Sequence, residues 1–146
     1  MAYELLIEVC GPGLSPQSRS HWGFAIREPG ATFGDLLHVQ VIDLEKLWYQ
    51  FDAREGIDLV TMQAEGMAKV IDLTVEQRRR VVAIIRAEPA PRDGMRRCQE
   101  WMVDTLVSLE VDELVPDGTA EFWSGLVGKR ADEVKQAAGA NWTPLR

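Results

Sequence analysis

Three side chains in this sequence are of the types that thiol catalysis uses: Cys98, His21 and His38. The chain has two histidines and two cysteines in all. Thiol catalysis requires a nucleophilic sulfur, a base within hydrogen-bond distance and a group that fixes the tautomer of that base. Cys98 is predicted to lie in the first turns of a helix, where unpaired backbone amides, the helix dipole and the neighbouring Arg96 and Arg97 favour an anion. We therefore take Cys98 as the candidate nucleophile and the histidines as the candidate base and orienting group.

The two histidines lie on consecutive predicted strands. In the strand His21–Glu28, bulky side chains alternate with small ones, and Gly23 and Ala25 leave one face nearly bare. We expect the helix that carries Cys98 to approach the sheet over this bare face. The second histidine lies on the returning strand, Asp35–Asp43. Whether the two imidazoles share a face depends on the strand register, because a slip of one residue moves a side chain to the other face.

The chain is predicted to be a single domain, 1–146, strand-rich over residues 1–73 and helix-rich over residues 74–146. A capping box at Thr74–Gln77 predicts a helix that ends before two closely spaced prolines, and a longer helix is predicted from Asp93 or Gly94 to about Glu110. Further strands are predicted at Tyr3–Cys10, Leu47–Arg54, Leu59–Gln63 and Met67–Leu73, with short helices at Thr119–Val127 and Lys129–Ala138. This pattern predicts an α+β fold in which a small antiparallel sheet packs against helices.

Composition and charge exclude several classes of protein. The sequence is 46% hydrophobic and 27% charged, which is typical of a globular domain that needs neither disulfides nor a metal. Its net charge of −7 disfavours a nucleic-acid partner. No apolar run reaches the ~18 residues of a membrane span and no secretory leader is visible. We therefore expect a cytoplasmic protein without a transmembrane segment and with reduced cysteines. No pattern indicates the oligomeric state.

Three short motifs carry a family resemblance: Ser20-His-Trp-Gly-Phe-Ala-Ile26, Leu36-Leu-His-Val39 and Arg97-Cys-Gln-Glu-Trp101. Together they resemble the lecithin retinol acyltransferase-like branch of the permuted papain-like thiol enzymes. The resemblance implies a permuted papain-like arrangement with His21 as base, His38 as its orienting group and Cys98 as nucleophile. The chain departs from the family pattern at Arg97, where the family commonly has asparagine.

These residues predict a cysteine-dependent hydrolase or acyltransferase that acts on an amide, ester or thioester. The substrate is expected to be a small molecule or a peptide, and no cofactor is expected. The Cys98 backbone amide is a candidate oxyanion donor, with Gln99 or Gln40 as alternative second donors. Trp22, which follows His21 in the sequence, is a candidate substrate contact.

Two other functions fit the same residues. One is a module of the same fold that binds a small molecule or a protein without covalent chemistry. The other is a biosynthetic enzyme that uses His21 for acid–base catalysis. Cys98 also fits a buried apolar helix face, and Cys10 is expected to be structural. No metal site is predicted, because no closely spaced Cys or His pair occurs.

Overall fold

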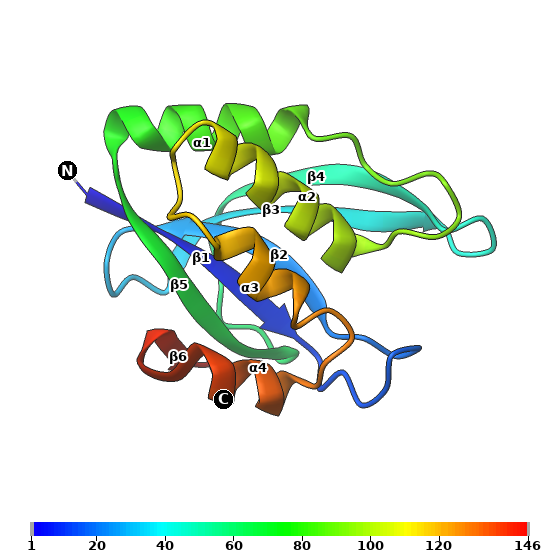
Figure 1. Cartoon of the computed structure of the whole chain (residues 1–146). Helices are drawn as coiled ribbons and strands as arrows, with labels where there is room; N and C mark the ends of the chain where they lie inside the picture. The colour runs from blue at the N-terminus through cyan, green and yellow to red at the C-terminus, as the bar shows by residue number, and fades with distance from the viewer. Residues whose placement is uncertain (1, 146) are drawn as a thin grey trace.

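Six strands form one antiparallel sheet in the order β4-β3-β2-β1-β5-β6 in the computed structural model, which describes residues 2–145 (Figure 1). The strands are β1 (Ala2–Cys10), β2 (His21–Arg27), β3 (Phe33–Asp43), β4 (Trp48–Asp58), β5 (Ala64–Thr74) and β6 (Trp142–Pro144). The helices are α1 (Val75–Ala87), α2 (Cys98–Val111), α3 (Thr119–Ser124) and α4 (Ala131–Ala138), followed by the short 3₁₀ helix η1 (Gly139–Asn141). The predicted α+β class, with an antiparallel sheet packed against helices, is confirmed.

Local sequence signals account for where the two long helices begin. The capping box predicted at Thr74 is present, with its side chain accepting a hydrogen bond from the Gln77 amide. Helix α2 begins at Cys98, later than the predicted Asp93. The Asp93 carboxylate accepts hydrogen bonds from the amides of Met95 and Arg96, and Gly94 has a φ of +77°. This turn is incompatible with helix, so the cysteine becomes the first helical residue.

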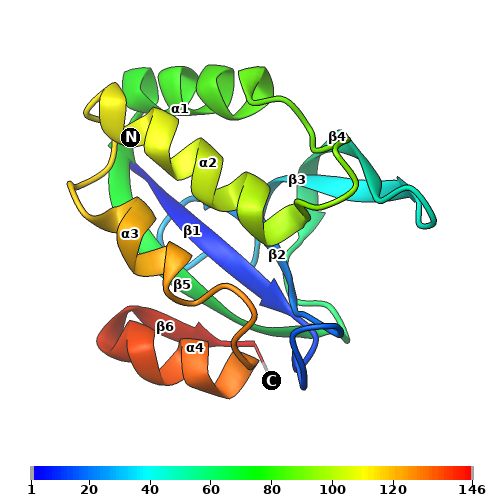
Figure 2. The same ribbon diagram turned by 45° about the vertical axis from the view of Figure 1, so that its right-hand side comes forward.

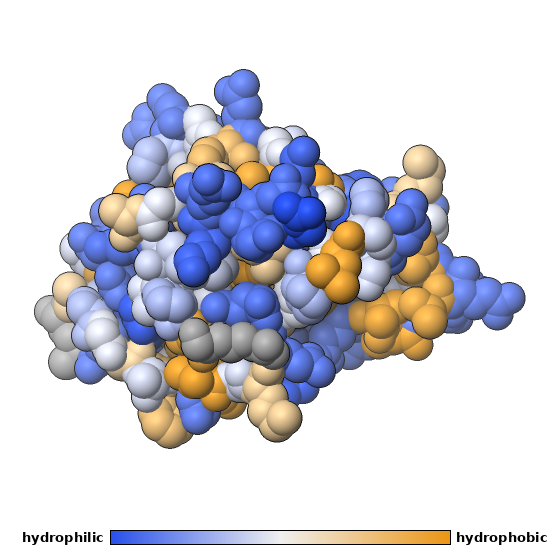
Figure 3. Space-filling model, turned by 90° about the horizontal axis from the view of Figure 1, so that it is seen from below, coloured by the Kyte–Doolittle hydropathy of each residue, from blue (hydrophilic) through white to orange (hydrophobic). Residues whose placement is uncertain are grey.

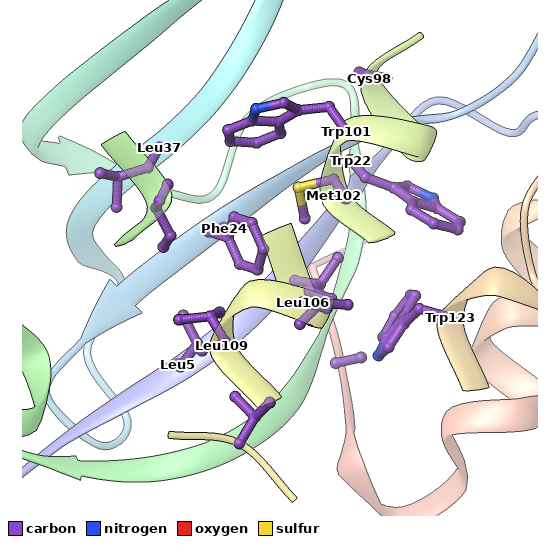
Figure 4. Close-up of a cluster of buried hydrophobic side chains, with 14 of the residues drawn as sticks. Leu5, Trp22, Phe24, Leu37, Cys98, Trp101, Met102, Leu106, Leu109 and Trp123 are labelled. Carbon is purple, nitrogen blue, oxygen red and sulfur yellow. The ribbon is translucent and has the colours of Figure 1, made fainter. Parts of the chain in front are cut away.

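The helices α1, α2 and α3 pack against one face of the sheet (Figure 2). We call this the helix-covered face; it carries Trp22 and Phe24 of β2 (Figure 4). The Trp22 ring lies 5.2 Å from that of Trp123 in α3, and the Phe24 ring lies 5.9 Å from that of Trp101 in α2. The expectation that α2 approaches over the bare face is therefore wrong. The bulky side chains supply the apolar area that holds the helices.

The opposite side of the sheet, which we call the open face, carries His21, Gly23 and Ala25. The connection from β4 to β5, residues 59–63, must pass β3, β2 and β1 to reach its next strand. Leu59 in this crossover connection is buried against Leu6 and Ala25 in a second, smaller apolar cluster. The strand predicted at Leu59–Gln63 is thus wrong: the apolar residue there anchors an irregular segment.

None of the helices within residues 2–145 has the length and apolar character needed to span a membrane.

Candidate active site

Four polar side chains form a row across the open face, one from each of the strands β1 to β4. Cys10 of β1 lies opposite His21 of β2, and His38 of β3 lies opposite Asp52 of β4. The β2–β3 register pairs Phe24 with Leu37, which puts His21 and His38 on the same face, diagonal to each other. The register that the sequence left open therefore brings the two predicted histidines together.

The last three residues of this row are joined by hydrogen bonds. His21 Nε2 lies 2.8 Å from His38 Nδ1, and His38 Nε2 lies 3.0 Å from Asp52 Oδ2. An ionised carboxylate only accepts, so neutral His38 carries its proton on Nε2 and its Nδ1 accepts in turn. His21 must then donate from Nε2, which leaves the lone pair of its Nδ1 for a substrate. The order Asp52, His38, His21 thus fixes both tautomers.

Burial and charge set the protonation of this chain of groups. Burial, with a smaller effect of the His38 charge, lowers the pKa of His21 to about 4. Burial also lowers the pKa of His38, against the opposing effect of Asp52. The hydrogen bonds from His38 and from Arg54, 2.9 Å away, lower the pKa of Asp52. At neutral pH both imidazoles are therefore free bases and the carboxylate is ionised.

A pocket of about 450 Å³ lies between the open face and the crossover connection. His21 and His38 line it, as does Glu8 from β1, and Thr61 and Gln63 of the connection form its wall. The Gln63 carbonyl accepts a hydrogen bond of 2.8 Å from the amide of residue 11, which ties the connection to the end of β1. Reacting groups and a concave space therefore occur at the same place.

Glu8 and Cys10 form one wall of this pocket, and burial favours the neutral form of both groups. Glu8 is only 3% exposed, and burial, together with the Asp58 charge, raises the pKa of its carboxyl to about 7. The Cys10 thiol lies 3.5 Å from Glu8 Oε1. Burial and the charge of Glu8 raise the pKa of this thiol to about 12, so Cys10 remains a thiol and not a nucleophilic thiolate.

The structure does not bring Cys98 to His21. Cys98 is the first residue of α2 and packs in the main core on the helix-covered face, beside the backbone of Trp22 (Figure 4). The His21 imidazole belongs to the open face, and no hydrogen bond joins the two residues within the described chain. Burial raises the pKa of the Cys98 thiol. The nearby strand β2 therefore separates the predicted nucleophile from the predicted base.

The three predicted substrate or oxyanion residues have different positions. The Gln99 side chain is fully buried; its amide donates to the Ser20 carbonyl at 2.9 Å and accepts from the Gly128 amide at 2.8 Å. It joins α2 to two loops, which is a structural role. Trp22 has no exposed surface and belongs to the core, so it contacts no substrate. Gln40 is exposed and lines the pocket.

Two residues of this site, Glu8 and Asp52, were not found from the sequence. Asp52 is brought to His38 only by the pairing of β3 with β4. Glu8 had a visible signal: in β1 the residues Leu5, Ile7 and Val9 alternate with a second set that ends in Glu8 and Cys10. An acid and a thiol on one face of an otherwise apolar strand indicate a polar site.

The donor set of this pocket does not resemble a metal centre. Within residues 2–145, no three histidine, cysteine, aspartate or glutamate side chains are arranged to hold a metal ion. His21 Nε2 and His38 Nδ1 lie 2.8 Å apart, which leaves no room for an ion between them.

Comparison with known proteins gives a family but no activity. No curated protein and no solved structure matches the chain significantly. Residues 9–116 match a family of unknown function, DUF6540. This range includes His21, His38, Asp52 and both cysteines, and it ends after α2. Because the match covers most of the 146 residues, the chain belongs to the DUF6540 family.

Proposed function

We propose that this protein is an acid–base enzyme in which His21 acts as a general base on a carbonyl substrate bound in the open-face pocket. The observation that carries the proposal is the hydrogen-bonded series His21, His38, Asp52, with distances of 2.8 and 3.0 Å. In this series the Nδ1 lone pair of His21 is free to accept a proton. The positive charge that results can pass through His38 toward the Asp52 carboxylate. We infer hydrolysis of an ester or amide as the reaction.

The proposed reaction uses water as nucleophile. The water oxygen attacks the carbonyl carbon while its proton moves to His21 Nδ1, and the electron pair of the C=O bond moves to the carbonyl oxygen. The Nε2 proton of His21 can shift to His38 Nδ1, which places the positive charge beside Asp52. When the tetrahedral intermediate collapses, the oxyanion electron pair re-forms the C=O bond and the bond to the leaving group breaks. His38 returns its Nδ1 proton to His21 Nε2, and the leaving group takes the proton from His21 Nδ1. No residue changes its oxidation state or its covalent bonds.

The thiol mechanism predicted from the sequence, in a permuted papain-like arrangement, is the alternative. Its support is the place of Cys98, at the first turn of α2 and beside the first residues of β2. It requires His21 to leave His38 and turn toward the helix-covered face. The two mechanisms make opposite predictions for removal of the sulfur.

Hydrolysis of p-nitrophenyl acetate, an activated ester, tests the proposal with purified protein. We expect His21→Gln to reduce kcat/KM by about 10²-fold, the usual contribution of a general base. We expect Cys98→Ala to retain activity within about threefold, since the sulfur takes no part. Circular dichroism and thermal unfolding of each variant check that the fold is intact.

The outcomes separate three functions. Loss of activity in His21→Gln alone supports acid–base catalysis. Loss in Cys98→Ala contradicts it and favours the thiol enzyme. If neither substitution changes the rate, the ester is not hydrolysed at this pocket, and the proposal is overturned in favour of a binding module.

A further inference from the structure

We propose that Glu8 is the group that selects the substrate in this pocket: a neutral carboxylic acid that donates a hydrogen bond to the carbonyl oxygen of an uncharged ligand. This inference rests on the proposed function, because it supplies the partner for the oxygen that becomes negative when water attacks. It assigns a ligand class, a neutral carbonyl compound, and a substrate-binding residue.

The position of Glu8 on the open face brings it close to His21. Its cross-strand neighbour is Gly23, and the neighbour of Cys10 is His21, so Glu8 lies diagonally beside His21 on the open face. The side chains of Leu36 and His38 pack over Gly23, and Glu8, Cys10, His21 and Gly23 all line the pocket. A ligand in contact with Glu8 therefore also lies beside His21.

One carboxyl oxygen of Glu8 has no hydrogen-bond partner in the described chain. Glu8 is 97% buried, being 3% exposed, and its Oε2 is enclosed with no hydrogen-bond partner in the described chain. Oε1 is engaged by the Cys10 thiol. A buried polar atom without a partner costs about 1–3 kcal/mol, so natural proteins rarely retain one without a role. When the carboxyl turns so that this oxygen faces the pocket that Glu8 lines, a ligand there would provide the missing partner.

Burial favours the protonated form of the Glu8 carboxyl. Burial and the Asp58 charge raise the pKa of Glu8 to about 7, and among residues 2–145 no lysine or arginine lines the pocket. Below this pH the carboxyl is neutral, and since Oε1 accepts from Cys10, the proton resides on Oε2 as a donor. A donor in a water-poor site requires an acceptor, which a carbonyl oxygen is. The charge of Asp58, which acts on Glu8, disfavours an anionic ligand.

Apolar side chains are exposed next to the pocket. Val41, which lines the pocket, is 43% exposed, and Ile42 and Leu44 follow it with 53% and 77% exposure in the β3–β4 hairpin. Figure 3 shows apolar groups toward this end of the molecule, next to hydrophilic ones. An uncharged ligand with a hydrocarbon portion fits this combination of one buried donor and an apolar rim.

Three probes with the same six-carbon chain and different head groups test the ligand class. They are hexanamide, hexylamine and hexanoate, which are neutral, cationic and anionic. Binding is followed at pH 6 through the NMR signals of the backbone amides of His21 and Gly23. We expect hexanamide to bind most tightly. Tighter binding of hexylamine or hexanoate, or no binding of any probe, overturns the proposal.

Two substitutions test the role of the donor. Glu8→Leu removes it at similar volume, and we expect hexanamide to bind about tenfold more weakly, the effect of one lost hydrogen bond. Glu8→Gln retains an N–H donor, and we expect binding within about threefold of the original protein. Binding that is unchanged in Glu8→Leu overturns the proposal.

His21→Gln separates this inference from the proposed function. We expect it to bind hexanamide as the original protein does, because the donor is on Glu8. If His21→Gln hydrolyses the ester normally while Glu8→Leu loses hexanamide, the proposed function fails and the ligand assignment stands. If His21→Gln abolishes hydrolysis while Glu8→Leu binds hexanamide normally, the proposed function stands and the ligand assignment fails.

Discussion

His38 Nε2 lies 3.0 Å from Asp52 Oδ2, and this contact determines which nitrogen of His21 is free. The two residues face each other on neighbouring strands, so the contact follows from the β3–β4 pairing. The carboxylate accepts a hydrogen bond from His38 Nε2–H, His38 Nδ1 accepts one from His21 Nε2–H, and His21 Nδ1 carries no proton. A side chain at the edge of the sheet thereby controls a base two strands away.

Replacing Asp52 by asparagine is expected to reverse this order. The asparagine amide can donate to His38 Nε2, which stabilises the Nδ1–H tautomer of His38 and turns His21 Nε2 into an acceptor. His21 Nδ1 then carries the proton and is no longer a base. We expect kcat/KM for p-nitrophenyl acetate to fall by about 10²-fold, and ¹⁵N NMR of the imidazoles to report the exchanged tautomers.

Arg54→Gln is the matched control for this substitution. It removes a partner of Asp52 while the carboxylate stays, so we expect the Nε2–H tautomer of His38 to persist. Arg54 contributes to lowering the pKa of His38, so its loss should raise that pKa. A change of tautomer in Arg54→Gln would contradict the assigned role of Asp52.

Glu8→Gln is expected to stabilise the protein at high pH. The folded-state pKa of Glu8, about 7, is above the ordinary 4.5, so between these values the folded protein binds more protons than the unfolded chain. Stability from this group is therefore present below pH 4.5 and lost as pH rises through 7. We expect urea unfolding at pH 8 to show Glu8→Gln more stable by about 1–3 kcal/mol, and no such gain at pH 4.5. Equal stability of the two proteins at pH 8 would show that ionisation of the buried Glu8 carboxyl does not destabilise the folded protein.

His21→Gln is expected to change the pH dependence of folding stability in the opposite direction. Here the folded-state pKa, about 4, is below the ordinary 6.5, so the unfolded chain binds more protons between these values. The stability that neutral His21 contributes is present above pH 6.5 and lost as pH falls toward 4. Relative to the original protein, we expect His21→Gln to gain about 1–2 kcal/mol between pH 6.5 and 4. A difference in stability that does not vary over this interval would contradict a buried, neutral imidazole.

Both thiols are expected to react slowly with iodoacetamide at pH 7. Burial raises the pKa of Cys98, and burial with nearby carboxylates raises that of Cys10 to about 12, so neither is a thiolate. Mass spectrometry of the alkylated peptides should show both cysteines reacting no faster than free cysteine. Fast, selective labelling of Cys98 would instead support the thiol enzyme predicted from the sequence.

Local patterns predicted most of the elements but not the face of the sheet that the helices cover. The capping box at Thr74 and the alternation from Trp22 to Ile26 are encoded in neighbouring residues, and both predictions are confirmed. The face of the sheet that receives α2 depends on how much apolar area each face offers, and the large rings of Trp22 and Phe24 outweigh the closer approach that Gly23 allows.

The composition of the candidate site could be predicted only in part. The two histidines are visible because the residue is rare, whereas their partner Asp52 is one of 23 acidic residues and is distinguished only by strand pairing. The pocket also depends on a connection that crosses three strands, and no local pattern specifies its path.

Trp22 and His21 are adjacent in the chain yet belong to opposite faces of β2, one with the core and the other with the polar row. Inserting or deleting a single residue before them would exchange the two sets, exposing an indole to water and forcing an imidazole among apolar rings. Point substitutions on the open face leave the contacts with the helices in place. Evolution can thus vary the chemistry of this surface one side chain at a time, whereas the length of the strand is fixed.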